Sequence, residues 1–447
     1  MENIDTLISA RWVIPVEPDD TVLNHHSVAI RDGKIVALLP TRAATETFNP
    51  AETVALADHA LIPGLVNAHT HAAMSLFRGL ADDLSLMDWL ENHIWPAEAK
   101  WVSDEFVRDG TRLTIAEMLK SGTTCFNDMY FFPEDTARVC ADAGMRAAIG
   151  LIVVDFPTIW AQTPEEYLHK GLQLHDDLRN SELIKTVFAP HAPYSVSDGP
   201  FERIRIINNE LNLPVTIHLH ETAHEVDEAV KKTGARPLAR LGKLDLLNPN
   251  LVAVHMTVLL TQEIETLATA GVNVVHCPES NMKLASGFCR VNDLLAAGIN
   301  VALGTDSAAS NNDLDMLDET RMAALLAKAV SNDATTLPAH TALRMATLNG
   351  ARALGLDERV GSLEANKSAD MTAIDLSGIT SQPVYDPVSQ IIYTAGRDQV
   401  TDVWVAGKRL LKDRVLTTLD EGTILRKAAQ WRDQIAASDK DSGEPGG

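Results

Sequence analysis

Residues 61–71 read Leu-Ile-Pro-Gly-Leu-Val-Asn-Ala-His-Thr-His, an apolar run that ends in two histidines. The run predicts a short buried strand over Leu61–Val66. Residues two apart in an extended chain point to the same face, so His69 and His71 could direct two imidazoles at one point, as a metal ion requires. The same pair could be two surface or core histidines. The other ligands must therefore come from the rest of the chain.

Seven further apolar runs alternate with helical patterns after residue 71. The candidate strands are Thr123–Asn127, Arg146–Leu151, Thr186–Ala189, Val215–Leu219, Leu251–His255, Val272–His276 and Asn300–Gly304. Helical periodicity lies between them, for example in Phe106–Ser121, Phe201–Asn209 and Thr261–Ala270. About eight β-then-α units indicate a (β/α)8 TIM-type barrel, an α/β fold whose chemistry lies at the C-terminal ends of the strands.

Histidines and carboxylates follow the ends of these strands. They are His69, His71, His191, His218, His220, Glu221, His255, His276 and Asp306. Buried imidazoles and carboxylates destabilise a fold unless they are paired or ligated, which favours a metal centre over packing. Three imidazoles, one carboxylate and a water suit zinc, and the geometry also allows iron or manganese. We expect His69, His71, His218 and Asp306 to be the ligands, although His218 and His220 share one face of a strand.

The two ends of the chain predict a small β domain. Val28–Ala37 has two apolar runs around an Asp-Gly turn, which is a hairpin pattern, and similar strand patterns recur at 369–376 and 402–410. We expect residues 1–58 and 363–435, which end in a C-terminal helix, to form this domain, with the barrel at 59–362 inserted between them. Residues 436–447 contain no core-forming side chains and are expected to be disordered.

Composition narrows the function classes. The 447 residues carry a net charge of -23, which argues against binding nucleic acid through its phosphates. No apolar run is long enough to span a membrane, and the N-terminus lacks the pattern of a signal peptide. The four cysteines include no C-x-x-C pair and are expected to be reduced and mostly buried, so we expect a cytoplasmic protein.

The motifs together resemble the amidohydrolase superfamily over nearly the whole chain. The pieces are residues 63–71, His218-x-x-Glu221, His255, His276-Cys-Pro-x-Ser-Asn281 and Gly304-Thr-Asp306. Within it, the chain is most similar to the 5-methylthioadenosine/S-adenosylhomocysteine deaminases. That similarity rests on residues 78–84, Asp88-Trp-Leu90, Trp95-Pro-x-Glu98 and Ala189-Pro-His-Ala-Pro-Tyr-Ser195.

The resemblance implies the barrel, a small β-sandwich built from both termini, and the roles of the catalytic residues. His218 becomes the preferred ligand, because the family places a catalytic glutamate three residues later. Strand four ends without a lysine that could bridge two metals, so one metal is expected. The metal would lower the pKa of a water. Asp306 would take its proton, His255 would orient the hydroxide and Glu221 would protonate adenine N1.

The substrate implied is a nucleoside. By the family pattern, Glu98 would accept hydrogen bonds from the ribose, His191 would contact the nucleoside, Glu221 the base, and Trp89 would lie near the 5′ substituent. Alternatively, Trp89 is a core aromatic of a helix over 86–94 and Glu98 a solvated helix residue. Relatives that accept S-adenosylhomocysteine can carry arginines after strand three, and no arginine occurs here between Arg146 and Arg179. We therefore predict 5′-methylthioadenosine, with adenosine, over S-adenosylhomocysteine.

Three other readings stay open at this point. A deaminase of guanine or another free base, or an s-triazine chlorohydrolase, would use the same metal set with a different pocket. A non-catalytic scaffold protein on the same barrel is disfavoured, because all the ligands are present.

The barrel type also suggests a homo-oligomer, either a dimer or a tetramer.

Overall fold

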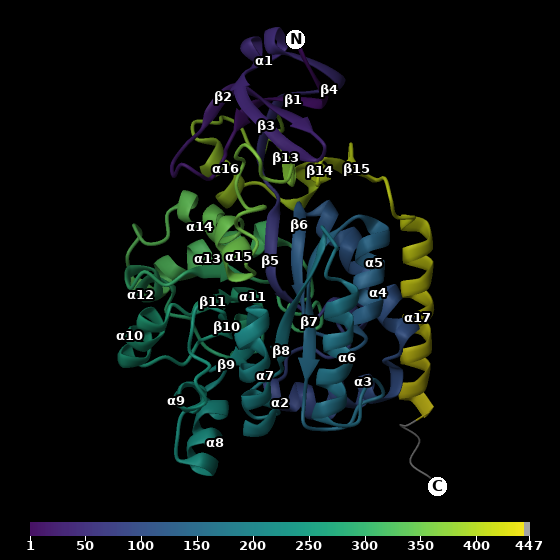
Figure 1. Cartoon of the computed structure of the whole chain (residues 1–447), viewed down its shortest axis with the longest axis vertical. Helices are drawn as coiled ribbons and strands as arrows, with labels where there is room; N and C mark the ends of the chain where they lie inside the picture. Colours follow the sequence, from purple (N-terminus) through teal and green to yellow (C-terminus); the bar gives the residue numbers. More distant parts are fainter. Residues whose placement is uncertain (442–447) are drawn as a thin grey trace.

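The computed structural model describes residues 1–441 and contains two eight-stranded sheets, one in a barrel and one in a smaller domain. Figure 1 shows the smaller domain at one end of the barrel and the C-terminal helix along the barrel's side. The four cysteines are all free and buried, as predicted. No helix within residues 1–441 is long and apolar enough to cross a membrane.

The barrel sheet is parallel, with its strands in sequence order. Its strands are β5 (Leu65–Thr70), β6 (Thr123–Asp128), β7 (Arg146–Val153), β8 (Ile184–Pro190), β9 (Val215–Leu219), β10 (Leu251–His255), β11 (Asn273–His276) and β12 (Val301–Leu303). The outer helices include α4 (Asp104–Lys120), α5 (Pro133–Ala143), α6 (Pro164–Asp177), α7 (Asp198–Leu211), α8 (Ala223–Thr233), α9 (Pro237–Lys243), α10 (Thr261–Ala270), α11 (Pro278–Lys283), α12 (Val291–Ala296), α13 (Met316–Ser331), α14 (Ala339–Met345) and α15 (Leu348–Ala353). The predicted (β/α)8 barrel is confirmed.

The last strand returns to the first and closes the barrel. The Asp306 backbone N–H donates to the carbonyl of His69 at 3.0 Å, and a parallel bridge joins Thr70 to Asp306. Closure of the barrel therefore brings Asp306, which follows the last strand, beside His69 and His71 at the end of the first strand.

The first barrel strand begins later than predicted. The apolar run at 61–66 is split: β4 (Phe48–Pro63) belongs to the small domain, and β5 begins at Leu65. Gly64 lies between them, where a Cβ atom would come within 2.0 Å of the Thr124 side chain. Both halves are fully buried and apolar, so the hydrophobic pattern did not reveal the break. The small-domain sheet accordingly extends past the predicted boundary at residue 58.

Both chain ends contribute to the sheet of the small domain. Its order is β16 (Val415–Leu416), β15 (Lys408–Lys412), β14 (Val400–Val405), β13 (Met371–Asp375), β4, β1 (Glu2–Val13), β2 (Leu23–Arg31) and β3 (Lys34–Pro40). The helices α1 (Thr41–Thr47) and α16 (Pro387–Tyr393) belong to the same two chain segments. The β2–β3 hairpin forms at Asp32-Gly33 as predicted, and both residues have positive φ.

Two further helical segments follow the first barrel strand and the last strand of the small domain. After β5 the chain forms η1 (Ala72–Phe77), α2 (Leu86–Trp89), η2 (Leu90–Ile94) and α3 (Trp95–Trp101). The C-terminal helix α17 (Glu421–Asp441) lies beside α4, where Trp431 Nε1 donates to Asp109 at 3.1 Å (Figure 1). Residues 436–441, expected to be disordered, continue this helix, because a helix needs no further core residue beyond Ile435 to propagate. The rest of that expected tail lies outside the described residues.

Candidate active site

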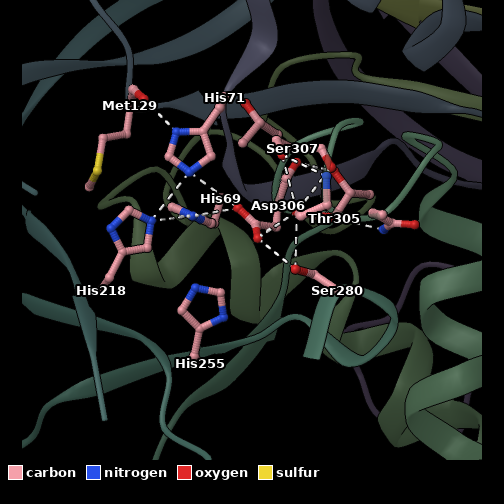
Figure 2. Close-up of polar contacts among 12 residues, drawn as sticks. His69, His71, Met129, His218, His255, Ser280, Thr305, Asp306 and Ser307 are labelled. Atoms are coloured by element: carbon pink, nitrogen blue, oxygen red, sulfur yellow. Dashed lines mark hydrogen bonds and ion pairs between the residues drawn. The ribbon is translucent and has the colours of Figure 1, made fainter. Parts of the chain in front are cut away.

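Each predicted ligand follows or ends a barrel strand. His69 lies in β5 and His71 just after it, His218 lies in β9, and Asp306 follows β12. One nitrogen of each histidine and one oxygen of Asp306 lie within 4.8 Å of one another. Figure 2 shows the four side chains converging from different strands. The structure therefore brings together all four residues that the sequence proposed.

The ligand atoms face one another at short range. His218 Nε2 is 3.1 Å from His69 Nε2 and 3.2 Å from His71 Nε2. Asp306 Oδ1 is 3.3 Å from His69 Nε2 and 3.2 Å from His71 Nε2. Such a group of buried nitrogens and a carboxylate is the donor set of a divalent transition metal.

Backbone carbonyls set the tautomers of two of these histidines. His71 Nδ1 donates to the Met129 carbonyl at 2.6 Å, and His218 Nδ1 donates to the His191 carbonyl at 2.7 Å. When both rings are neutral, their Nε2 atoms carry lone pairs. Burial lowers the pKa of His218 well below the ordinary value, whereas the Asp306 carboxylate raises the pKa of His71 against the effect of burial. Two lone pairs at about 3 Å repel unless a proton or a metal ion lies between them. The residues therefore fit a metal ion.

His220 does not take part in the metal group. Strand β9 ends at Leu219, and His220 has a φ of 53°, which turns its side chain away from the cluster. Its Nδ1 donates to the Val258 carbonyl at 3.0 Å, and its Nε2 accepts from the Leu238 N–H at 3.1 Å. The end of strand β9 therefore directs His218 rather than His220 at the cluster, in line with the preference that the resemblance implied.

Glu221 and His255 lie on the cavity side of the metal group. His255 Nε2 is 3.8 Å from Glu221 Oε2, and Asn281 Nδ2 is 3.0 Å from His255 Nδ1. Burial raises the pKa of Glu221 well above its ordinary value, and the nearby Asp306 carboxylate raises it further. Burial lowers the pKa of His255 to about 3. The pair therefore combines a carboxyl whose protonated form burial favours with a neutral imidazole.

A cavity of about 740 Å³ opens from this centre. The metal group reaches it through His71, His218 and Asp306, and Glu221, His255, Glu98, His191 and Trp89 also line it. Glu98 accepts a hydrogen bond from the Tyr130 hydroxyl at 2.7 Å, and His191 Nδ1 is 2.8 Å from Ser195 Oγ. Trp89 is 5% exposed and also packs in the apolar cluster around Phe77. All the residues that we expected to contact the substrate thus line the same cavity.

The sequence missed four side chains that support the site. Tyr130 follows β6, and Ser280 and Ser310 donate to Asp306 Oδ2 at 2.7 and 2.9 Å. Asn281 contacts His255. Ser280 and Asn281 stand in a motif that carries the family resemblance, and Tyr130 lies two residues after β6, so all three positions carried a signal in the sequence. Ser310 lies in an ordinary loop and carried no signal.

A (β/α)8 barrel with three histidines and an aspartate at its strand ends defines a metal-dependent hydrolase. The sequence model of the Amidohydrolase family matches residues 60–410. The chain belongs to the amidohydrolase family, as the sequence motifs led us to expect.

Three relatives show how far the similarity reaches. A 5-methylthioadenosine/S-adenosylhomocysteine deaminase of Saccharophagus degradans is 52% identical, over 97% of each chain. The crystal structure of an adenosine deaminase from Xanthomonas campestris with bound zinc is 55% identical, with a TM-score of 0.97, over 98% of this chain and 99% of that one. A zinc-complexed atrazine chlorohydrolase from Arthrobacter aurescens has a TM-score of 0.89 over 95% and 99% of the two chains, but at 23% identity it is similar in fold alone.

Proposed function

We propose that this chain hydrolytically deaminates the adenine C6 amino group of 5′-methylthioadenosine, and of adenosine, giving the inosine analogue and ammonia, with one zinc ion per chain. The observation that carries the proposal is the position of Glu221, a buried carboxyl that lines a cavity of about 740 Å³ beside the metal group. The full-length relatives named as deaminases of such nucleosides support it.

A bound zinc ion would supply Lewis acidity that lowers the pKa of a water. Asp306 takes a proton from the attacking water, and His255 donates from Nε2 to the oxygen as it bonds to C6. Glu221 gives its proton to N1 of the ring, which then accepts the electron pair of the C6–N1 double bond. Glu221 next takes the proton of the new C6 hydroxyl, and Asp306 returns its proton to the amino group, so ammonia leaves. Atoms and charges balance, and N1 keeps its proton in the product.

The outer cavity supports a ribose and an apolar 5′ group. The hydrogen bond from the Tyr130 hydroxyl holds the Glu98 side chain in place. A carboxylate in this position can accept hydrogen bonds from a ribose diol. The apolar side chains that line the cavity include Ile152, Val154, Phe156 and Ile159. Among all the residues that line the cavity within the described chain there is no arginine or lysine. The carboxylate of S-adenosylhomocysteine would therefore find no cationic partner from any loop of one chain, which favours a methylthio group.

Ammonia release by the zinc-loaded protein tests the proposal. We expect fast turnover of 5′-methylthioadenosine and adenosine and slow turnover of S-adenosylhomocysteine. Guanine and an s-triazine should be tested in parallel, because a free-base deaminase and a chlorohydrolase are the alternatives within the family. Turnover of either of these without turnover of a nucleoside would overturn the proposal.

We further propose the cytoplasm as the compartment, which the four buried free cysteines support. The net charge of -23 supports the absence of a nucleic-acid partner. A homodimer or homotetramer stays a prediction from the barrel type, which light scattering after size-exclusion chromatography would test.

A further inference from the structure

Two neighbouring residues of one short helix contact two catalytic side chains. Ser280 and Asn281 lie in α11, which begins directly after β11 and Cys277. Ser280 is 0% and Asn281 1% exposed, so neither interacts with solvent. Figure 2 shows Ser280 hydrogen-bonded to Asp306, with His255 below the ligand group.

Ser280 and Ser310 hold one oxygen of Asp306. Both hydroxyls donate to Oδ2, at 2.7 and 2.9 Å, because an ionised carboxylate can only accept. Ser307 Oγ lies 3.0 Å from Ser310 Oγ and supports the second donor. Oδ1, which has no such contact with a hydroxyl of residues 1–441, is the oxygen that faces His69 and His71. The two serines thus occupy Oδ2 and leave Oδ1 as the oxygen that would meet a bound metal.

Asn281 contacts the ring nitrogen of His255 that faces away from the cavity. A neutral imidazole carries one proton, and the partner of one nitrogen decides where that proton is. Asn281 Nδ2 donates to Nδ1, so Nε2 carries the proton and faces Glu221 Oε2 at 3.8 Å. Turning the amide over would leave buried N–H groups without an acceptor, whereas the present orientation leaves only Oδ1 without a partner among the described residues.

We propose that Ser280 and Asn281 are positioning residues for the deamination: Ser280 presents Asp306 Oδ1 to the metal, and Asn281 fixes His255 with its proton on Nε2, where it can donate to the attacking oxygen. Two adjacent residues of α11 thereby set the orientation of both the proposed base and the proposed donor. The inference rests on the proposed function for its chemistry. Its geometry can be measured without any substrate.

The first test is the tautomer of His255 in the zinc-loaded wild-type protein. Protein labelled with ¹⁵N in its histidine rings gives long-range proton–nitrogen spectra that show which ring nitrogen carries the proton, and the His255→Gln variant assigns the signal. We expect the proton on Nε2 in the wild type and on Nδ1 in Asn281→Asp, because a carboxylate only accepts. A wild-type proton on Nδ1, or the same tautomer in both proteins, would overturn the role of Asn281.

The second test separates positioning from substrate binding. We expect Asn281→Asp, Asn281→Ala and Ser280→Ala each to lower kcat by about 10- to 100-fold with little change in KM. The double variant Ser280→Ala/Ser310→Ala should also bind zinc more weakly in a chelator competition. The matched control is Glu279→Gln, an isosteric change at the preceding position of α11, whose side chain does not line the cavity and should leave kcat unchanged.

The outcomes distinguish this inference from the proposed function. Wild-type kcat and wild-type zinc affinity in all these variants would contradict the positioning roles while leaving the deaminase proposal standing. No turnover of any nucleoside by the wild type would defeat the proposed function, and the tautomer and the zinc affinity would still test the geometry. If an Asn281 variant does not fold, the wild-type spectrum and the Ser280 variant decide.

Discussion

Glu221 is the residue whose removal should affect the chemistry most. It lines the cavity beside His255, and burial raises its pKa well above the ordinary value, which favours the protonated form. Glu221→Gln keeps the shape and removes the transferable proton. We expect kcat for 5′-methylthioadenosine to fall by about 10²- to 10⁴-fold, with unchanged zinc content, measured by ammonia release and metal analysis. Near-wild-type turnover would show that the role assigned to Glu221 is wrong.

Glu98 should give substrate binding a pH dependence. Burial raises the pKa of Glu98 to about 7, although the hydrogen bond from Tyr130 lowers it in part. Only the ionised form offers both oxygens to a ribose diol, so KM should fall as pH rises through about 7. The measurement is KM against pH for the wild type and for Glu98→Gln, whose KM should be high and flat. A wild-type KM that does not change across neutral pH would refute the role.

The sequence predicted the individual histidines and carboxylates of the site but not the serine and tyrosine hydroxyls that support them. His69, His71, His218, His255 and Asp306 were predictable because each stands at a strand end, and a barrel brings strand ends together. Choosing His218 over His220 needed the position where β9 ends, which alternation does not give. Ser310 was not predictable, because serine is common in loops and its contact with Asp306 is made only by the folded chain.

A buried ion pair joins the barrel to the small domain. Arg146, the first residue of β7, makes two bonds to Asp370, just before β13: Nε to Oδ2 at 2.7 Å and Nη2 to Oδ1 at 3.0 Å. Their side chains are 4% and 1% exposed. Arg146→Met leaves a buried carboxylate without its partner and should destabilise the protein by about 3–5 kcal/mol, measured by urea unfolding of the zinc-loaded protein.

The control for that prediction is the double variant Arg146→Met/Asp370→Asn. It leaves no buried charge, and the amide oxygen can still accept the hydrogen bond from the Ala406 N–H. It should recover most of the lost stability. Equal stability of the single and the double variant would mean that the uncompensated charge is not what destabilises Arg146→Met.

Helices and strands were predictable where the apolar pattern fits only one kind of secondary structure and polar turns flank it. Thr261–Ala270 is helical at the predicted bounds, and β9 and β10 also match, because their apolar runs are flanked by polar turns. The end of β4 was not predictable, since a domain boundary fell inside one buried apolar run at Pro63-Gly64. The last turn and a half of α17, residues 436–441, was not predictable, because a helix can extend without adding core residues.

The whole molecule should disfavour a substrate with a carboxylate. The net charge is -23, and no arginine or lysine lines the cavity within the described chain. We expect kcat/KM for 5′-methylthioadenosine to exceed that for S-adenosylhomocysteine by roughly tenfold or more, since leaving a carboxylate unpaired costs more than about 1.4 kcal/mol. Parallel kinetics with the two nucleosides measure the ratio.

A gain-of-function variant tests the reason for that preference. Ile159 lines the mouth of the cavity and is 67% exposed, so an arginine fits there without burial. Ile159→Arg should raise kcat/KM for S-adenosylhomocysteine and leave that for adenosine nearly unchanged, and Ile159→Gln is the uncharged control. Equal effects of both variants would show that the missing positive charge does not set the preference.

The most direct measurement of the central claim is a zinc titration of the metal-free protein, followed by ammonia release from 5′-methylthioadenosine. If His69, His71, His218 and Asp306 hold one catalytic ion, activity should rise linearly to one equivalent of zinc per chain and then stay constant. Full activity in the metal-free protein, or a rise that continues to two equivalents, would contradict the account.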